Sequence, residues 1–115
     1  MNENLVLQKS KKFAVRVVGL YKFLIKKQVE KDIARQILRS GTSIGANISE
    51  GQYAASKPDF INKLQISLKE AAETRYWLEL LVETESLEKV QFESLHSDIE
   101  DIIKLLTKIL NTAKQ

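Results

Sequence analysis

Cysteine is absent from this 115-residue sequence, and histidine, proline and tryptophan each occur once. Without cysteine, the chain forms no disulfide and offers no thiolate as a nucleophile or metal ligand. This composition suits a reducing compartment, so we expect a cytoplasmic protein.

The sequence also lacks an apolar segment of membrane-spanning length. Lys9, Lys11, Lys12 and Arg16 interrupt the early apolar runs, and no later run approaches the roughly 20 apolar residues that span a bilayer. We therefore expect a soluble protein with neither a signal peptide nor a membrane partner.

A single histidine restricts the available catalytic chemistry. His96 follows Glu93 at the Glu-x-x-His spacing, but di-metal bundles need this motif from two helices together with further glutamates. No pairing of a nucleophile with a base emerges from the remaining residues. We therefore predict a non-enzyme without catalytic residues, metal or cofactor, in which His96 is a surface side chain.

Charge is distributed unevenly along the chain, although the net charge is only +3. Residues 1–39 carry ten Lys/Arg against three Asp/Glu, whereas residues 70–101 carry two against ten. The folded molecule should therefore have a basic side and an acidic side. Such a molecule could pair with copies of itself or bind nucleic acid, and two ordinary solvated faces are the plainer alternative.

Four amphipathic segments with helical periodicity account for most of the sequence. The first spans residues 5–27 and has one apolar stripe, formed by Val6, Phe13, Val17, Leu20 and Leu24. The second begins after a polar turn at 28–31 and continues to about Ala54. The third ends near 84–87. Short connections between helices of this length favour antiparallel neighbours. We therefore predict one domain, residues 1–115, folded as an all-α, up-down-up-down antiparallel four-helix bundle.

Local signals support two of these segments. Ser56, Pro58 and Asp59 suit the start of the third as a cap, a first-turn proline and a first-turn acid. The fourth has the most regular apolar row, with alternating spacings of three and four, formed by Phe92, Leu95, Ile99, Ile102, Leu106 and Ile109. This row predicts a helix that faces the core along its whole length.

The second segment is unusual because it contains Gly41, Gly45 and Gly51. Each internal glycine costs a helix roughly 1 kcal/mol relative to alanine. The apolar positions nevertheless stay in register through the glycines, at Ile33, Ile37, Ile44, Ile48 and Ala55. We therefore predict a continuous helix, in which Gly41 and Gly45 let another backbone approach closely. A phosphate-binding loop is disfavoured, because a Walker Lys-Ser/Thr pair and a preceding strand are missing.

Small polar residues form a stripe beside these isoleucines: Gln36, Ser40, Ser43, Asn47 and Glu50. A solvated face more usually carries long charged side chains. We therefore predict that this stripe contacts another helix or subunit, with Ser43, Asn47 and Glu50 as its candidate interface residues. A plain solvated face, and a ligand or nucleic-acid surface, are the alternatives.

Arg75 lies among the apolar residues of the third helix, which are Phe60, Leu64, Leu68, Ala71, Leu78 and Val82. A guanidinium in this position needs a carboxylate, a helix C-terminus or water. We predict that Glu50 or Glu79 pairs with Arg75 at a packed contact. The alternative is an arginine that reaches solvent without a special partner.

Three motifs in the middle of the chain are more specific than helical periodicity. Residues 35–51 read Arg-Gln-Ile-Leu-Arg-Ser-Gly-Thr-Ser-Ile-Gly-Ala-Asn-Ile-Ser-Glu-Gly, residues 57–64 read Lys-Pro-Asp-Phe-Ile-Asn-Lys-Leu, and residues 68–78 read Leu-Lys-Glu-Ala-Ala-Glu-Thr-Arg-Tyr-Trp-Leu. Together they resemble the four-helix-bundle family of proteins encoded in intervening sequences of bacterial 23S ribosomal RNA genes. The resemblance implies an up-down bundle that assembles as a ring-shaped homopentamer. It includes a relative, the accessory variability protein of diversity-generating retroelements, that binds nucleic acid and a reverse transcriptase.

The basic residues provide the leading functional hypothesis, which is RNA or DNA binding through Lys9, Lys12, Arg16, Arg35 and Arg39. A ring of copies would place several basic edges side by side and multiply a weak affinity for phosphate. The competing hypothesis is a protein-interaction scaffold without nucleic acid. In that scaffold, the basic first helix docks on the acidic third or fourth helix of a neighbour.

Overall fold

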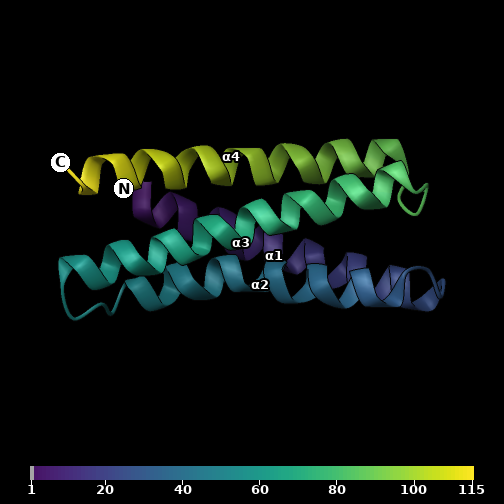
Figure 1. The fold of residues 1–115 in the computed structure, drawn as a ribbon, viewed down its shortest axis with the longest axis horizontal. Coiled ribbons are helices and arrows are strands. Elements are labelled where there is room, and N and C mark those ends of the chain that lie inside the picture. The colour runs from purple at the N-terminus through teal and green to yellow at the C-terminus, as the bar shows by residue number, and fades with distance from the viewer. Residues whose placement is uncertain (1) are drawn as a thin grey trace.

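The computed structural model describes residues 2–115 as four helices joined by short loops. Their bounds are Asn2–Lys26 for α1, Lys31–Gly51 for α2, Lys57–Glu83 for α3 and Lys89–Ala113 for α4. The α1–α2 and α3–α4 loops lie at one end of the bundle, and the α2–α3 loop lies at the other end with both termini (Figure 1). This arrangement confirms the predicted all-α, up-down-up-down bundle.

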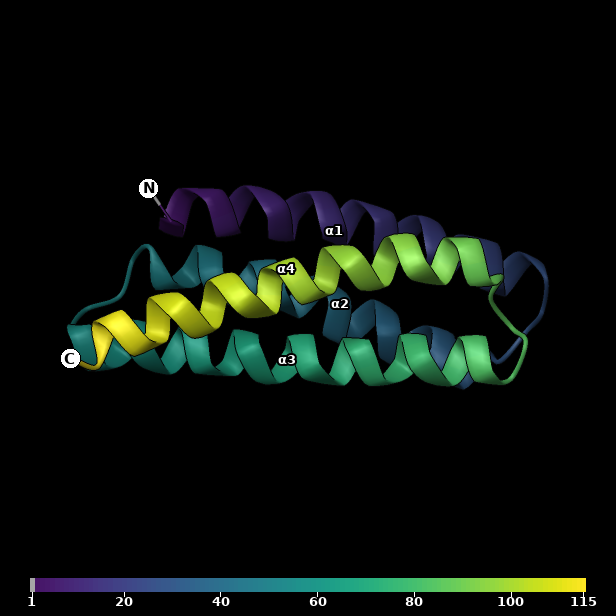
Figure 2. The same cartoon turned by 90° about the horizontal axis from the view of Figure 1, so that it is seen from above.

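Each helix packs against its neighbours in chain order, and α4 closes the bundle against α1. Figure 2 shows α1 and α3 on opposite sides, with α2 and α4 between them at different depths. The bundle measures 44 × 21 × 18 Å. None of the four described helices combines the length and apolarity needed to cross a membrane.

One apolar core runs along the bundle axis. Helix α1 contributes its predicted stripe, which is fully or almost fully buried and consists of Val6, Phe13, Val17, Leu20 and Leu24. In α4 the predicted row is also buried, except for Phe92, which lies half-buried at its edge. The periodicity of the sequence therefore locates the core correctly in both helices.

The glycine-rich segment of α2 is a continuous helix, as predicted. A Cβ atom at Gly41 would lie 2.8 Å from both Cγ atoms of Val17, and a Cβ at Gly45 would lie 3.1 Å from Ser10 Oγ. Real Cβ atoms essentially never approach to 2.8 Å and seldom to 3.1 Å, so the two glycines, Gly41 above all, allow α2 to lie close to α1.

Helix α2 ends at Gly51, earlier than predicted, and Ala55 is exposed in the following loop. The prediction that Ala55 extends the apolar stripe was therefore wrong. Ser56 Oγ accepts a hydrogen bond from the Asp59 amide at 3.2 Å, and the Asp59 carboxylate accepts one from the Ala55 amide at 3.1 Å. This capping arrangement starts α3 as predicted, but it requires the chain to leave α2 before Ser56.

Two glycine substitutions test the close approach of α1 and α2. Gly41→Ala should destabilise the fold by about 1–3 kcal/mol, because the new methyl group overlaps Val17. Gly19→Ala in α1 is the matched control, since a Cβ there has no neighbour within 4 Å. The control should stabilise the fold by up to about 1 kcal/mol. Urea denaturation measures both changes, and equal effects of the two substitutions would contradict the proposed close contact.

Candidate functional site

Small residues occupy the outward side of α2 in its C-terminal half, between the exposed charges of Arg39 and Glu50, and we call Thr42, Ser43, Ala46, Asn47 and Ser49 the α2 outer face. The hydroxyls of Thr42 and Ser43 donate to the carbonyl oxygens of Leu38 and Arg39, each at 2.7 Å. The Asn47 amide likewise donates to the Ser43 carbonyl oxygen at 2.9 Å. Since these polar groups bond to their own helix, covering the face leaves few donors unsatisfied.

The α2 outer face borders a hollow of about 330 Å³ between α1 and α2. Its lining consists of Leu7, Lys11 and Ala14 from α1 and Thr42, Gly45, Ala46 and Ser49 from α2. The absence of a side chain at Gly45 and the single methyl group of Ala46 leave this space open. The predicted contact residues therefore separate: Gly41 and Gly45 pack within the bundle, whereas Ser43 and Asn47 point outward.

Charged residues line the other edge of α2, where it meets α3. Arg39 lies 2.7 Å from a Glu73 oxygen and 3.7 Å from Glu70 Oε2, and the Trp77 indole donates to Glu73 at 2.9 Å. Nearer the α2–α3 loop, Lys63 pairs with Glu50 at 2.8 Å. A side-chain hydrogen bond to Glu50 raises the pKa of Lys63 above its ordinary 10.5. These ion pairs join α2 to α3 along the surface.

Buried hydroxyls lie between α2 and α3. Ser40 belongs to the stripe predicted to contact another helix, whereas Ser67 and Thr74 were not predicted as contact residues. Ser67 Oγ donates to the Ile44 carbonyl oxygen at 2.8 Å, and Thr74 Oγ1 lies 2.8 Å from Ser40 Oγ. Ser40, Ser67 and Thr74 are fully buried. Ser67 and Thr74 are seven residues apart on α3, and this spacing was the available signal. It was overlooked because Ser and Thr usually indicate an exposed face.

The ion pair of Arg75 differs from the prediction. Its guanidinium donates to Glu100 of α4 at 2.8 Å, so the prediction of Glu50 or Glu79 as partner was wrong. Arg75 faces α4 rather than α2. Glu50 pairs instead with Lys63. At a rise of about 1.5 Å per residue, Arg75 lies about 18 Å farther along α3, too far away to share this partner.

His96 belongs to the same α3–α4 contact. Its Nε2 lies 3.6 Å from Glu79 and 3.9 Å from Glu100, and its ring lies 5.0 Å from that of Phe92. The side chain is 31% exposed. In the described part of the chain, no group of three or more histidine or acidic residues is arranged to hold a metal ion.

The five predicted nucleic-acid residues fall on two different edges. Lys9, Lys12 and Arg16 lie toward α4, where Arg16 pairs with Asp98 at 2.6 Å. Arg35 and Arg39 lie on α2 and pair with acidic residues of α2 and α3. The structure therefore does not bring the five residues together. The three arginines among them already have carboxylate partners.

The Arg75–Glu100 pair should make stability depend on pH. The Arg75 hydrogen bond lowers the pKa of Glu100 below its ordinary 4.5, so its stabilising contribution is complete above that value and is lost as pH falls through the lowered one. Glu100→Gln should cost about 0.5–1 kcal/mol at pH 7 and progressively less as the pH falls below 4.5. Urea denaturation across this range tests the difference, with Glu93→Gln on the exposed side of α4 as control. A cost that is constant with pH would indicate lost packing instead.

Comparison with known proteins agrees with this geometry. The sequence matches the family described as "23S rRNA-intervening sequence protein" over residues 2–108. The fold is similar to the crystal structure of a protein with unknown function from the S23 ribosomal protein family of Bacteroides thetaiotaomicron, with a TM-score of 0.94 and 57% sequence identity. That similarity covers 96% of this chain and 99% of the other. No curated protein matches the sequence.

The family match begins at the start of α1 and ends in the last turns of α4, so it includes the glycine-rich segment, the α2 outer face and the Arg75 contact. The resemblance predicted from the three motifs is confirmed. The chain belongs to the family of 23S rRNA-intervening sequence proteins.

Proposed function

We propose that this protein is a non-enzymatic bundle that assembles with copies of itself through the α2 outer face. The main support is the hydrogen bonding of that face, where Thr42, Ser43 and Asn47 bond to their own helix. Burying polar groups is costly when their hydrogen bonds to water are not replaced, and here that cost is small. The adjacent hollow of about 330 Å³ offers space for a side chain of the neighbouring copy.

The family resemblance favours a closed ring of five copies, and we include this homopentamer in the proposal. A ring needs two different surfaces on each chain, because each copy contacts one neighbour through one surface and the other neighbour through another. The α2 outer face would supply one of them. It lacks charged residues, so this assembly should persist at high salt.

Light scattering of the purified protein tests the assembly. Ala46→Arg places a long charged side chain on the α2 outer face and should shift the mass toward that of a monomer. Ser97→Arg on the exposed side of α4 is the control and should keep the wild-type mass. A monomeric wild-type protein would overturn the proposal. An assembly that dissociates with salt would instead favour charge-paired docking between the basic and acidic helices.

Nucleic-acid binding is a second candidate function, supported by the exposed side of α1. Lys11, Lys12, Lys22 and Lys26 share this side, which we call the lysine face. In the described chain, none of them lies within 4.0 Å of a carboxylate, whereas Arg16, Arg35 and Arg39 are all paired. Unpaired cations bind phosphate without first breaking an ion pair. We therefore propose that the lysine face is the principal phosphate contact.

Fluorescence anisotropy with a labelled single-stranded RNA tests this second function. The double variant Lys22→Ala/Lys26→Ala should weaken binding several-fold and lower the salt dependence, because each lost phosphate contact removes about 0.7 from the slope of log K against log salt. The matched control is Lys104→Ala/Lys108→Ala, an exposed pair with the same spacing on α4. Equal losses in both variants would show that net charge, rather than the lysine face, determines binding.

A further inference from the structure

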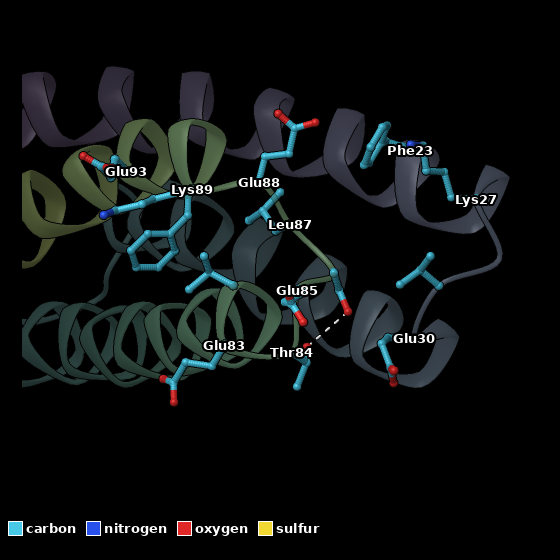
Figure 3. Close-up of a pocket in the computed structure, with 14 residues that line it drawn as sticks. Phe23, Lys27, Glu30, Glu83, Thr84, Glu85, Leu87, Glu88, Lys89 and Glu93 are labelled. Atoms are coloured by element: carbon cyan, nitrogen blue, oxygen red, sulfur yellow. Dashed lines mark hydrogen bonds between the residues drawn. The ribbon is translucent and has the colours of Figure 1, made fainter.

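A large open hollow lies at the end of the bundle where the α1–α2 and α3–α4 loops meet. It has a volume of about 1090 Å³, and we call it the loop-end pocket (Figure 3). Figure 3 shows that its side chains come from both loops and from the adjoining ends of α1, α3 and α4. The α2 outer face lies nearer the other end of α2, so neither this pocket nor its occupant follows from the proposed assembly.

The floor of the loop-end pocket is apolar. It is formed by Phe23, Val29, Val82, Leu87 and Phe92. Leu87 is only 4% exposed, and the other four are partly exposed. Partly exposed apolar groups gathered in one hollow favour an occupant with an apolar side, at roughly 25 cal/mol for each Å² removed from water.

The rim of the pocket is acidic. Glu30, Glu83, Glu85, Glu88 and Glu93 surround the floor, against Lys27 and Lys89. In the described part of the chain, none of these five carboxylates lies within 4.0 Å of a basic group, although acids elsewhere pair with Arg16, Arg39, Lys63 and Arg75. The rim therefore offers several carboxylates that are free to pair with a cationic occupant.

Lys27 shows how an ammonium group can lie in this pocket. Its Nζ is 4.9 Å from the centre of the Phe23 ring, within the range of a cation–π contact. The aromatic floor thus already holds one cation of the chain itself. A ligand that carries ammonium or guanidinium groups beside apolar groups would use the same chemistry.

We propose that the loop-end pocket binds a short basic amphipathic segment of a partner protein. The apolar floor favours a peptide over a small polycation, because a small polycation carries no apolar side chains to cover it. A helical segment of about 11 residues is about 16 Å long, and the bundle is 18–21 Å wide. Apolar side chains of the segment would cover the floor, and its lysines or arginines would reach the rim.

Two other occupants fit less well. Nucleic acid would be repelled by the acidic rim. Helix α1 of a second copy is basic, but its apolar stripe is buried in its own core, as Val6, Phe13 and Val17 show. The exposed large apolar residues of α1, Leu5 and Val15, are ten residues or about 15 Å apart along the helix, so they form no continuous apolar face to cover the floor.

A fluorescein-labelled, 11-residue helical peptide with leucines on one face and lysines on the other is the probe, and anisotropy measures its binding. Glu83→Gln/Glu93→Gln should raise the Kd about three- to tenfold at low salt, since partly exposed ion pairs are individually weak. Phe92→Ala should also weaken binding, and Val82→Thr provides a near-isosteric change of the floor in case Phe92→Ala fails to fold. The controls are Asp101→Asn and Val90→Ala, exposed α4 residues outside the pocket. They should leave the Kd unchanged.

Several results would overturn the proposal. These are no binding of the peptide, equal binding to pocket and control variants, or equal binding of a scrambled peptide with the same charge. Effective competition by spermine would assign the pocket to a small polycation instead. Light scattering on the same samples separates the second-copy alternative, because loss of self-association in Glu83→Gln/Glu93→Gln would place another copy in the pocket. If the variant keeps the mass of the wild-type protein but binds the peptide more weakly, the pocket binds a partner segment. This conclusion holds whether the wild-type protein is a monomer or an oligomer.

Discussion

The structure depends on how closely α2 approaches its two neighbours. Gly41 and Gly45 have no side chain where α2 meets α1, and Ser40, Ser67 and Thr74 are the small residues where α2 meets α3. Larger side chains at these positions would separate the helices and open the core. The side of α2 that neither neighbour covers carries small residues in its C-terminal half, between Arg39 and Glu50. Small residues of α2 therefore contribute to both the compact core and the candidate assembly surface.

The sequence predicts the helices and their core far better than it predicts polar contacts between helices. Apolar periodicity depends only on the helical repeat, so the rows of α1 and α4 were predicted almost residue by residue. The partner of Arg75 depends instead on the rotation and axial position of α3 against α4, which spacing within one helix does not reveal. The end of α2 was predicted too late for a related reason. Ala55 fits the apolar periodicity of α2, but its amide donates to the Asp59 carboxylate at the start of α3.

The charged residues fall into two groups: those that join helices and those that remain available on the surface. Most arginines of the predicted basic side join helices, as Arg16 does with Asp98 and Arg39 with Glu73. The lysine face forms no ion pair in the described part of the chain, and the glutamates of the loop-end pocket surround an apolar floor. Net charge along the sequence thus predicted the two signs, but only the structure separates charges that stabilise contacts from charges available to a partner.

The buried hydroxyl contacts of α3 also determine its axial register. A core of leucine and isoleucine alone tolerates sliding of one helix along another, since one apolar row resembles the next. Sliding α3 by one turn would detach Ser67 from the Ile44 carbonyl and Thr74 from Ser40 together. The Ser67 hydroxyl would then lack a partner in the interior at a cost of about 1–3 kcal/mol, whereas Thr74 would keep its bond to the Glu70 carbonyl oxygen. These two hydrogen bonds therefore favour one axial register of α3 against α2. That register determines how the surface residues of the two helices lie relative to one another.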